Sequence, residues 1–195
     1  MVPALALGAE RPERGSMTQP PRKKSQQLLD LPLMLRAYCF LGLLEGLAGM
    51  TGFFLVWLSK GYGLMELQAI APSILSHSAT ATMTIYHQAT TMTLAVIVAC
   101  QDGNFFACRS ERFSIFRLGF FTNRFIWLGI AVEWVLILSI IYSPILQKIF
   151  STAPLQLIQW LALLICPPFI LLADELRKIV VMNQKMVVFK NQIYH

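Results

Sequence analysis

Hydrophobic residues gather in four long stretches of the chain, separated by segments that hold most of the polar residues. The stretches cover about residues 37–58, 86–108, 125–143 and 155–173. A helix needs roughly 20 apolar residues to cross the hydrocarbon core of a bilayer, and each stretch is about that long. The pattern therefore predicts an all-α membrane protein with four transmembrane helices.

The segments outside these stretches suggest a simple organisation. Residues 1–9 are apolar, but as a helix they would span only about 14 Å, too short to cross a bilayer. Residues 10–30 contain three prolines and clustered charge, which is typical of a linker. Pro167 and Pro168 should kink the fourth helix, because proline lacks a backbone N–H. We expect a half-helix stub with a cytoplasmic linker (1–35), a four-helix module (36–178) and a cytoplasmic tail (179–195).

Lysine and arginine are concentrated in alternate connecting segments. Only Lys60 lies in the connection after the first stretch, an expected loop over residues 60–84, and only Lys148 in the connection after the third. The remaining residues form three groups: Arg11, Arg14, Arg22, Lys23, Lys24 and Arg36; Arg109, Arg112, Arg117 and Arg124; Arg177, Lys178, Lys185 and Lys190. Short loops near membrane ends keep these residues on the cytoplasmic side. Both termini and the middle loop are therefore predicted to be cytoplasmic.

Composition agrees with a membrane protein. Hydrophobic residues make up 56% and charged residues 13% of the chain, whereas soluble proteins carry roughly 25% charged residues. The net charge is +6, but the positive residues sit beside membrane ends and form no patch with interleaved aromatic rings. We therefore expect membrane lipid with anionic headgroups as the partner, and no nucleic acid. Arginines and phenylalanines of the middle loop are expected at the headgroup boundary.

A ridge of glycines runs along the first predicted helix. Gly42, Gly46, Gly49 and Gly52 are spaced by four and three residues, so they share one face. Small residues on one face allow the backbone of another helix to approach closely. The alternative is that membrane helices simply tolerate glycine, but four in register favour a packing seam.

Three carboxylates fall inside the apolar stretches, where each ionisable group costs roughly 2.5 to 3.5 kcal/mol. They are Glu45, Asp102 and Glu133, on the first, second and third predicted helices. Counting residues from the cytoplasmic boundary places all three about 10 to 13 Å deep. The sequence therefore predicts one layer that contains three carboxylates from three helices.

The second helix adds a polar stripe to this layer. Thr90, Thr93, Gln101 and Asn104 recur at near-helical spacing. Their oxygens suit hard cations or a proton relay better than soft metals. The alternative is that these groups only hydrogen-bond neighbouring helices, and for Glu45 the sequence does not decide between the two. We regard Gln101, Asn104, Glu133, Asp102 and Glu45 as candidate cation-binding residues.

The cysteines and histidines predict no further chemistry. Cys39, Cys100, Cys108 and Cys166 lie in or at the ends of apolar stretches without paired metal-ligand spacing. We interpret them as packing residues. The three histidines are scattered and have no carboxylate at motif spacing. No metal-histidine site and no cofactor is expected.

Several segments resemble the C-terminal membrane portion of cation-transporting P-type ATPases, from the end of the sixth membrane helix to the tenth. The resemblance covers nearly the whole chain, and its order agrees with the four-span pattern. In chain order the similar segments are MVPALALGAE, QPPR, RAYCFLGLLEG, QATTMTLAVIVACQDGNFFACRS, FFTNRFIWLGIAVEW and CPPFILLADELRK.

The resemblance implies both a role and its limits. In the family the sixth helix carries a cation-binding Asp, and Met1 stands at that position here. Asn104 falls where sodium pumps place an Asp, Glu133 matches a ninth-helix Glu of those pumps, and Asp102 replaces a usually apolar residue. The chain has no DKTGT phosphorylation motif, no TGE motif and no nucleotide-binding domain. It is therefore not expected to be an enzyme by itself.

These expectations combine into one functional hypothesis. The chain would be a support module of a P-type cation pump, truncated or separately encoded, in the plasma (inner) membrane. It would brace the transport helices, with the glycine ridge docking the missing fifth helix, and the missing N-terminal part of the pump as partner. The alternative is a non-catalytic membrane interaction protein derived from such a pump. A freestanding carrier is a weaker third reading, because four helices offer little shelter for three carboxylates.

Overall fold

The chain is almost entirely helical where it is described. The computed structural model describes residues 31–75, 80–109 and 119–193, with Ala6, Gly8, Ala9 and Ile115. In chain order the helices are α2 (Leu31–Met34), η2 (Leu35–Gly42), α3 (Leu43–Ser59), α4 (Leu64–Leu75), α5 (Thr80–Cys108), α7 (Arg124–Tyr142), α8 (Pro144–Phe150), α9 (Leu157–Leu163) and α10 (Cys166–Ile193). No strand occurs among these residues. Most of the predicted stub, its linker and the middle loop lie outside the described residues.

Four helical stretches are long and apolar enough to cross a membrane. They are Leu35–Ser59, Ala81–Cys108, Arg124–Tyr142 and Leu157–Val181. The prediction of an all-α protein with four membrane-spanning helices is therefore confirmed. The side of the membrane on which the termini lie stays a prediction.

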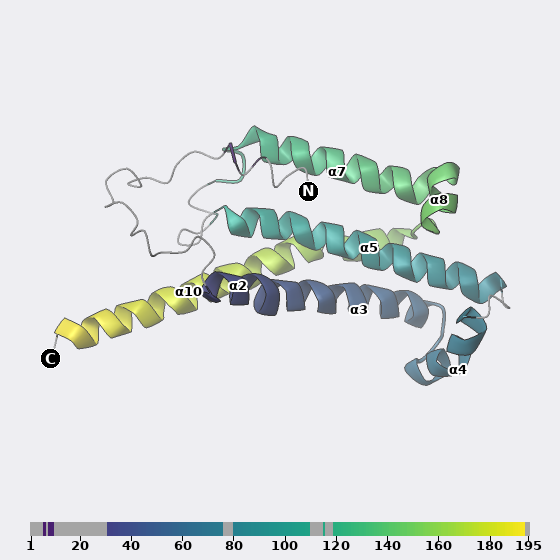
Figure 1. Ribbon diagram of the computed structural model, residues 1–195, viewed down its shortest axis with the longest axis horizontal. Helices are drawn as coiled ribbons and strands as arrows, with labels where there is room; N and C mark the ends of the chain where they lie inside the picture. Colours follow the sequence, from purple (N-terminus) through teal and green to yellow (C-terminus); the bar gives the residue numbers. More distant parts are fainter. Residues whose placement is uncertain are drawn as a thin grey trace.

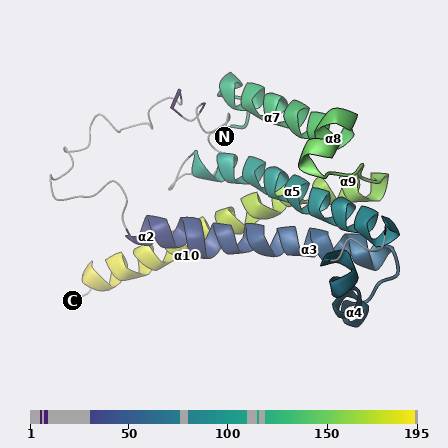
Figure 2. The ribbon, with the colours of Figure 1, turned by 45° about the vertical axis from the view of Figure 1, so that its right-hand side comes forward.

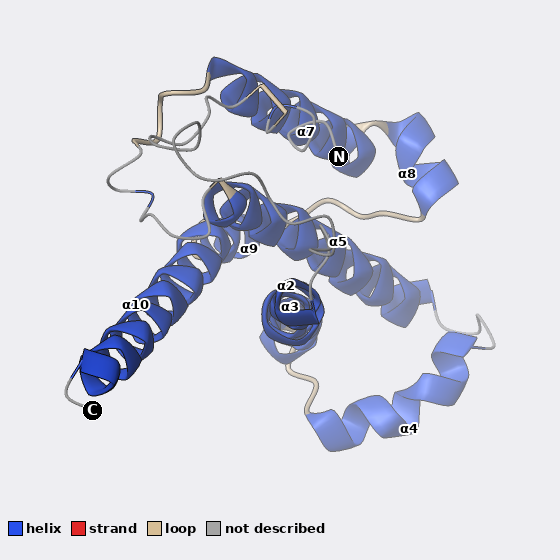
Figure 3. Ribbon diagram, turned by 60° about the vertical axis from the view of Figure 1, so that its left-hand side comes forward, coloured by secondary structure: helices blue, strands red, loops and turns tan. Residues whose placement is uncertain are grey.

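Helix α5 occupies the centre of the bundle. Its span is 56% buried, against 22 to 28% for the other three, so the neighbouring helices pack around it. Figures 1 and 3 show α3 and α7 on opposite sides of α5, with α10 crossing beside it. The most extensive contacts join α5 to α3 and to α10. Side chains of α5 can therefore meet three different partner helices.

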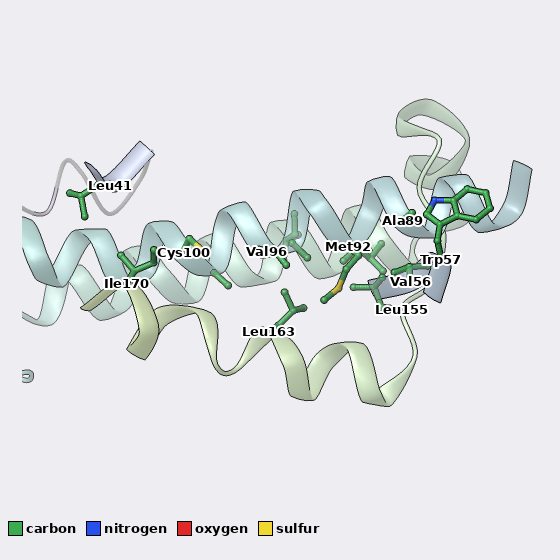
Figure 4. Packing of buried hydrophobic residues seen from close by; sticks show 14 residues of the cluster. Leu41, Val56, Trp57, Ala89, Met92, Val96, Cys100, Leu155, Leu163 and Ile170 are labelled. Carbon is green, nitrogen blue, oxygen red and sulfur yellow. The ribbon is translucent and has the colours of Figure 1, made fainter. Parts of the chain in front are cut away.

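The buried apolar core follows α5 along its length. Val56 and Trp57 lie at the end of the core where α3 ends, Met92 and Val96 lie in its middle, and Ile170 of α10 lies towards the opposite end (Figure 4). The largest of these side chains, that of Trp57, is fully buried. Because large residues alternate with alanines of α5, the three helices approach closely enough to enclose polar side chains.

Both connections expected on the outside contain helices. The segment over residues 60–84, predicted as a loop, holds α4, and only residues 76–79 lie outside the description. Glu66 caps the start of α4, because its Oε2 accepts a hydrogen bond from Gly63 N at 2.9 Å. In Figure 1, α4 and α8 lie at the same end of the bundle, opposite the C-terminal end of α10. The prediction of a loop was therefore wrong for α4. The position of α4 and α8 at the same end agrees with the two spans, α5 and α7, that separate them in the chain.

The fourth span is broken, but just before its prolines. Helix α9 ends at Leu163, and α10 begins at Cys166, so Pro167 and Pro168 occupy its first turn. Proline is tolerated there because the first N–H groups of a helix have no intrahelical partner. Figure 2 shows the two segments meeting beside α5. The predicted interruption is confirmed, and the structure places it one turn earlier. Beyond the span, α10 continues to Ile193 through most of the predicted tail.

Candidate functional site

Two glycines of the first span set the distance between α3 and α5. A Cβ added at Gly49 would lie 3.4 Å from Thr93 Cγ2, and one at Gly52 would lie 2.9 Å from Val96 Cγ2. The backbone of α3 therefore rests directly on side chains of α5. Glu45 lies one helical turn before Gly49, so the same close approach carries its carboxylate towards α5.

The predicted ridge thus has two different halves. Gly49 and Gly52 contact α5 of the same chain, so the expectation that they dock a missing helix is wrong for this half. At Gly46 an added Cβ would meet nothing within 4 Å, and at Gly42 it would meet only Ala37 O of the same span, at 3.3 Å. The open half keeps the docking role as a proposal only.

Glu45, Gln101 and Asn104 form an amide–carboxylate cluster between α3 and α5. Asn104 Nδ2 donates to Glu45 Oε2 at 3.2 Å, and the side chain of Gln101 lies close to this carboxylate. Asn104 Oδ1 is buried and has no hydrogen-bond partner among the described residues. One carboxylate and one uncommitted amide oxygen therefore lie together inside the membrane span.

Asp102, Glu133 and Trp134 form an indole–carboxylate cluster on the other side, between α5 and α7. Trp134 Nε1 donates to Asp102 Oδ2 at 2.7 Å, and Glu133 lies within electrostatic range of Asp102. Asp102 is only 5% exposed, and its Oδ1 has no hydrogen-bond partner in the described part of the chain. The layer predicted from residue counting is therefore divided by α5 into two clusters.

The two threonines of the predicted polar stripe have local roles. Thr90 Oγ1 donates to the carbonyls of Tyr86 and His87, at 3.1 and 3.0 Å. Thr93 Oγ1 donates to Ala89 O at 3.0 Å and lies 3.4 Å from Gly49 O. Hydroxyl groups that bond to helix carbonyls in this way are satisfied within the helix pair. Of the polar stripe, only Gln101 and Asn104 therefore remain in the candidate site.

A buried charge cluster near the C-terminal end of α5 was not identified from the sequence. Its centre is Asp174 of α10, which is fully buried. Arg36 Nη2, Arg177 Nε and Lys178 Nζ approach its carboxylate at 3.0, 2.8 and 3.2 Å. Glu175 adds a second carboxylate, 3.1 Å from Lys178 Nζ. Four of these residues come from the segment DELRK, whose acids precede the basic residues by three and four positions, a spacing that would have indicated the pairs.

The buried charge cluster also joins helices that are distant in sequence. Arg36 Nη2 and Lys178 Nζ donate to Ala107 O, near the end of α5, at 3.3 and 3.4 Å. Glu175 Oε1 accepts from Ile115 N, in the connection after α5, at 3.2 Å. Because positive charge is favourable at a helix C-terminus, these contacts tie the first span, α5 and α10 together.

One glycine outside the predicted ridge marks the tightest contact between two spans. A Cβ at Gly103 of α5 would lie 2.6 Å from Pro167 O and 3.2 Å from Pro167 Cα. No side chain fits there without movement of backbone, so α10 packs against α5 at Gly103. The residue lies between Asp102 and Asn104 and thereby fixes the position of both candidate clusters relative to α10.

The candidate site resembles no dense metal centre. Within the described ranges, no group of three or more histidine, cysteine, aspartate or glutamate side chains could hold a metal ion. Any cation bound here would need amide oxygens as well as carboxylates, which is the chemistry of hard cations.

Comparison with known proteins supplies the family. A family model described as "Cation transporting ATPase, C-terminus" matches residues 1–180. The chain belongs to the C-terminal membrane region of the cation-transporting P-type ATPases. With its four apolar spans, this region of a P-type ATPase is an integral membrane protein.

Individual relatives agree with this family. The chain is 32% identical over 164 residues to the "Probable cation-transporting ATPase F" of Mycobacterium tuberculosis, which covers 82% of this chain and 16% of that protein. It is 28% identical over 211 residues to the endoplasmic reticulum-type "Calcium-transporting ATPase 4" of Arabidopsis thaliana, covering 91% of this chain and 20% of that protein. It is also 26% identical over 210 residues to the "Potassium-transporting ATPase alpha chain 1" of Xenopus laevis, and this match covers 100% of this chain and 20% of that protein. The chain thus spans a sixth to a fifth of the length of these relatives.

Proposed function

We propose that this chain is the C-terminal support module of a P-type cation pump and contributes to cation binding. The observation that carries the proposal is the amide–carboxylate cluster, in which Asn104 donates to the Glu45 carboxylate inside a membrane span and Gln101 lies close by. A carboxylate in the hydrocarbon region is costly and marks functional sites in membrane proteins. The uncommitted Asn104 Oδ1 offers a further oxygen ligand.

The bracing role rests on different residues. The buried charge cluster fixes the inner ends of three spans, and Gly103 fixes α5 against α10. A rigid α5 would present Glu45, Gln101, Asn104, Asp102 and Glu133 at constant positions while other helices of a pump move. The open face at Gly46 would receive a helix of the missing N-terminal part.

Complementation tests this proposal. The chain is produced alone, and together with a pump fragment that carries the phosphorylation domain and the preceding membrane helices. Alone it should show no ATPase activity and no acid-stable phosphoenzyme, because these residues carry no DKTGT phosphorylation motif. With the fragment, vanadate-sensitive and cation-stimulated hydrolysis should appear. Failure of the two parts to form a complex would favour a non-catalytic membrane interaction protein.

Two variants separate bracing from cation binding in this assay. Gly46→Leu adds bulk on the open face and should reduce complex formation. Glu133→Gln keeps the shape of the side chain but removes its charge, so complex formation should persist while the cation dependence shifts. An unchanged cation dependence in Glu133→Gln, with assembly lost in Gly46→Leu, would leave only the bracing role.

Topology is tested with reporter fusions. We propose a plasma (inner) membrane protein whose termini and middle loop are cytoplasmic, supported by the distribution of Lys and Arg. Fusions after Leu29, Ser114 and His195 should report the cytoplasm. Fusions after Ser73 or Lys148 should report the outside, and exchanged signals at the termini would refute the orientation.

A further inference from the structure

Two of the four cysteines meet at the contact between α5 and α10. Cys100 of α5 is fully buried, whereas Cys166, the first residue of α10, is partly exposed. Cys166 packs against the buried cluster that contains Cys100, the two thiols lie close enough to interact, and Cys166 Sγ donates to Ala162 O at 3.8 Å. Figure 4 shows Cys100 in the cluster that also contains Ile170 of α10. The sequence, in which these residues are 66 positions apart, gave no indication of a pair.

The backbones beside this pair are unusually close. Gly103, one turn after Cys100, is the residue whose added Cβ would lie 3.2 Å from Pro167 Cα. Pro167 directly follows Cys166 in the chain. A disulfide needs Cα atoms about 4.4 to 6.8 Å apart and Cβ atoms directed towards each other. The Gly103–Pro167 contact therefore keeps the backbones of α5 and α10 close together beside the two thiols, as a disulfide between them requires.

We propose that Cys100 and Cys166 are a modification site, an oxidisable dithiol that closes to a disulfide between α5 and α10. Two thiols lose two protons and two electrons, and the S–S bond forms. The oxidant is an apolar two-electron acceptor dissolved in the bilayer, such as a lipid hydroperoxide, which becomes an alcohol and water. Cys166 is partly exposed and meets the oxidant first, and Cys100 then displaces the oxidised group from its sulfur.

The disulfide would act beside the amide–carboxylate cluster. Cys100 directly precedes Gln101, and it lies within electrostatic range of Glu45. A covalent link at this point would fix the start of α10 to the part of α5 that carries the cluster. The proposal does not depend on pump activity, because it concerns only contacts within the chain.

Thiol counting on the full chain in lipid nanodiscs tests the proposal. Cys39 and Cys108, both exposed, are first replaced in the variant Cys39→Ser/Cys108→Ser, which leaves only the proposed pair. The protein is treated with diamide, a membrane-permeant azo compound that takes up both electrons and both protons as it becomes a hydrazine. It is then denatured and labelled with polyethylene glycol maleimide. We expect two adducts before oxidation, none after it, and two again after reduction.

Further measurements separate an internal disulfide from other products. After denaturation and trypsin cleavage between α5 and α7, the oxidised fragments should stay joined on a non-reducing gel, and the intact mass should fall by two hydrogens. The additional substitution Cys100→Ser should leave one thiol that still reacts with maleimide or carries the oxidant's adduct. Circular dichroism checks that each variant keeps its helices. Two adducts that persist after oxidation, or a cross-linked dimer in place of joined fragments, would overturn the proposal.

Discussion

Asp174 and Asp102 are both buried aspartates of this chain, yet their surroundings differ completely. Asp174 is fully buried, and its carboxylate is approached by Arg36, Arg177 and Lys178 at 2.8 to 3.2 Å. Asp102 is 5% exposed, and its hydrogen bond from Trp134 reaches one oxygen while Oδ1 has no hydrogen-bond partner among the described residues. Among the described residues, the charge of Asp174 is paired with basic side chains, and no ion pair is found for the charge of Asp102.

The difference separates structural charge from available charge. A buried ion pair with complete partners holds helices in place, and removing one partner leaves an uncompensated charge. A buried oxygen without a donor carries a desolvation cost that a ligand can relieve. We therefore propose a bracing role for Asp174, and we keep Asp102, with Glu133, among the candidate cation-binding residues.

The largest effect is expected from Asp174→Asn. The amide preserves the shape but leaves the buried Arg36 without its counter-charge and Lys178 with Glu175 alone, so the free energy of unfolding should fall by about 3–5 kcal/mol. SDS-induced unfolding in mixed micelles, followed by circular dichroism, measures this change. Lys148→Gln, at an exposed position, should stay within about 0.5 kcal/mol of the parent.

A double variant checks that the loss comes from the ion pair itself. Arg36→Gln/Asp174→Asn should lose less stability than the two single variants added together, because the residues interact directly. Exact additivity would show that Asp174 acts through something other than Arg36.

The elements of the fold could be predicted because they depend on local patterns. A run of about 20 apolar residues fixes a spanning helix whatever its neighbours are, and all four predicted spans are present. The helix α4 was not predicted, because Pro72 and the surrounding residues resemble a loop. Inside α4 the missing N–H of Pro72 is tolerated, since the segment is short and its side chains are largely exposed.

The candidate site was predicted only in part because partners depend on packing. Residue counting selected side chains that the structure places in two clusters, but it could not show that α5 separates Glu45 from Asp102. The glycine pattern drew attention to the first span, whereas Gly103 has no regular spacing and gains its role from Pro167. Arg36 was treated as a boundary charge, because its partner Asp174 lies 138 residues away.

A second test, of close packing between helices, compares Gly103 of α5 with Gly46 of α3. Gly103→Ala places a methyl group 2.6 Å from Pro167 O, and such overpacking should cost about 1–3 kcal/mol. Gly46→Ala adds the same group in open space, and alanine's helix propensity should leave stability unchanged or raise it by up to about 1 kcal/mol. The same unfolding assay measures both. Equal losses would mean that glycine conformation, and not close packing, determines the result.

On the side of α5 that faces α3, Asn104→Ala tests the buried amide oxygen without a hydrogen-bond partner. The substitution removes Asn104 Oδ1 and the hydrogen bond to Glu45 without adding volume, so assembly with the pump fragment should persist. The cation concentration for half-maximal ATPase stimulation should rise about tenfold, which corresponds to about 1.4 kcal/mol. Gln68→Ala, at an exposed position of α4, provides the control. An unchanged half-maximal concentration would remove Asn104 from the candidate site.

Of the two buried aspartates, Asp102 is expected to give the smaller effect on stability, although Asp102→Asn is the same chemical change as Asp174→Asn. Asparagine keeps an oxygen that can accept the hydrogen bond from Trp134 Nε1. It removes a negative charge that forms no ion pair with a basic side chain among the described residues. The free energy of unfolding should therefore stay within about 1 kcal/mol of the parent, or rise, because a neutral amide costs less to bury than a carboxylate. The two substitutions are measured side by side in SDS-induced unfolding. If Asp102→Asn destabilises the chain as much as Asp174→Asn does, Asp102 has a compensating partner in the folded protein and the distinction between structural and available charge fails.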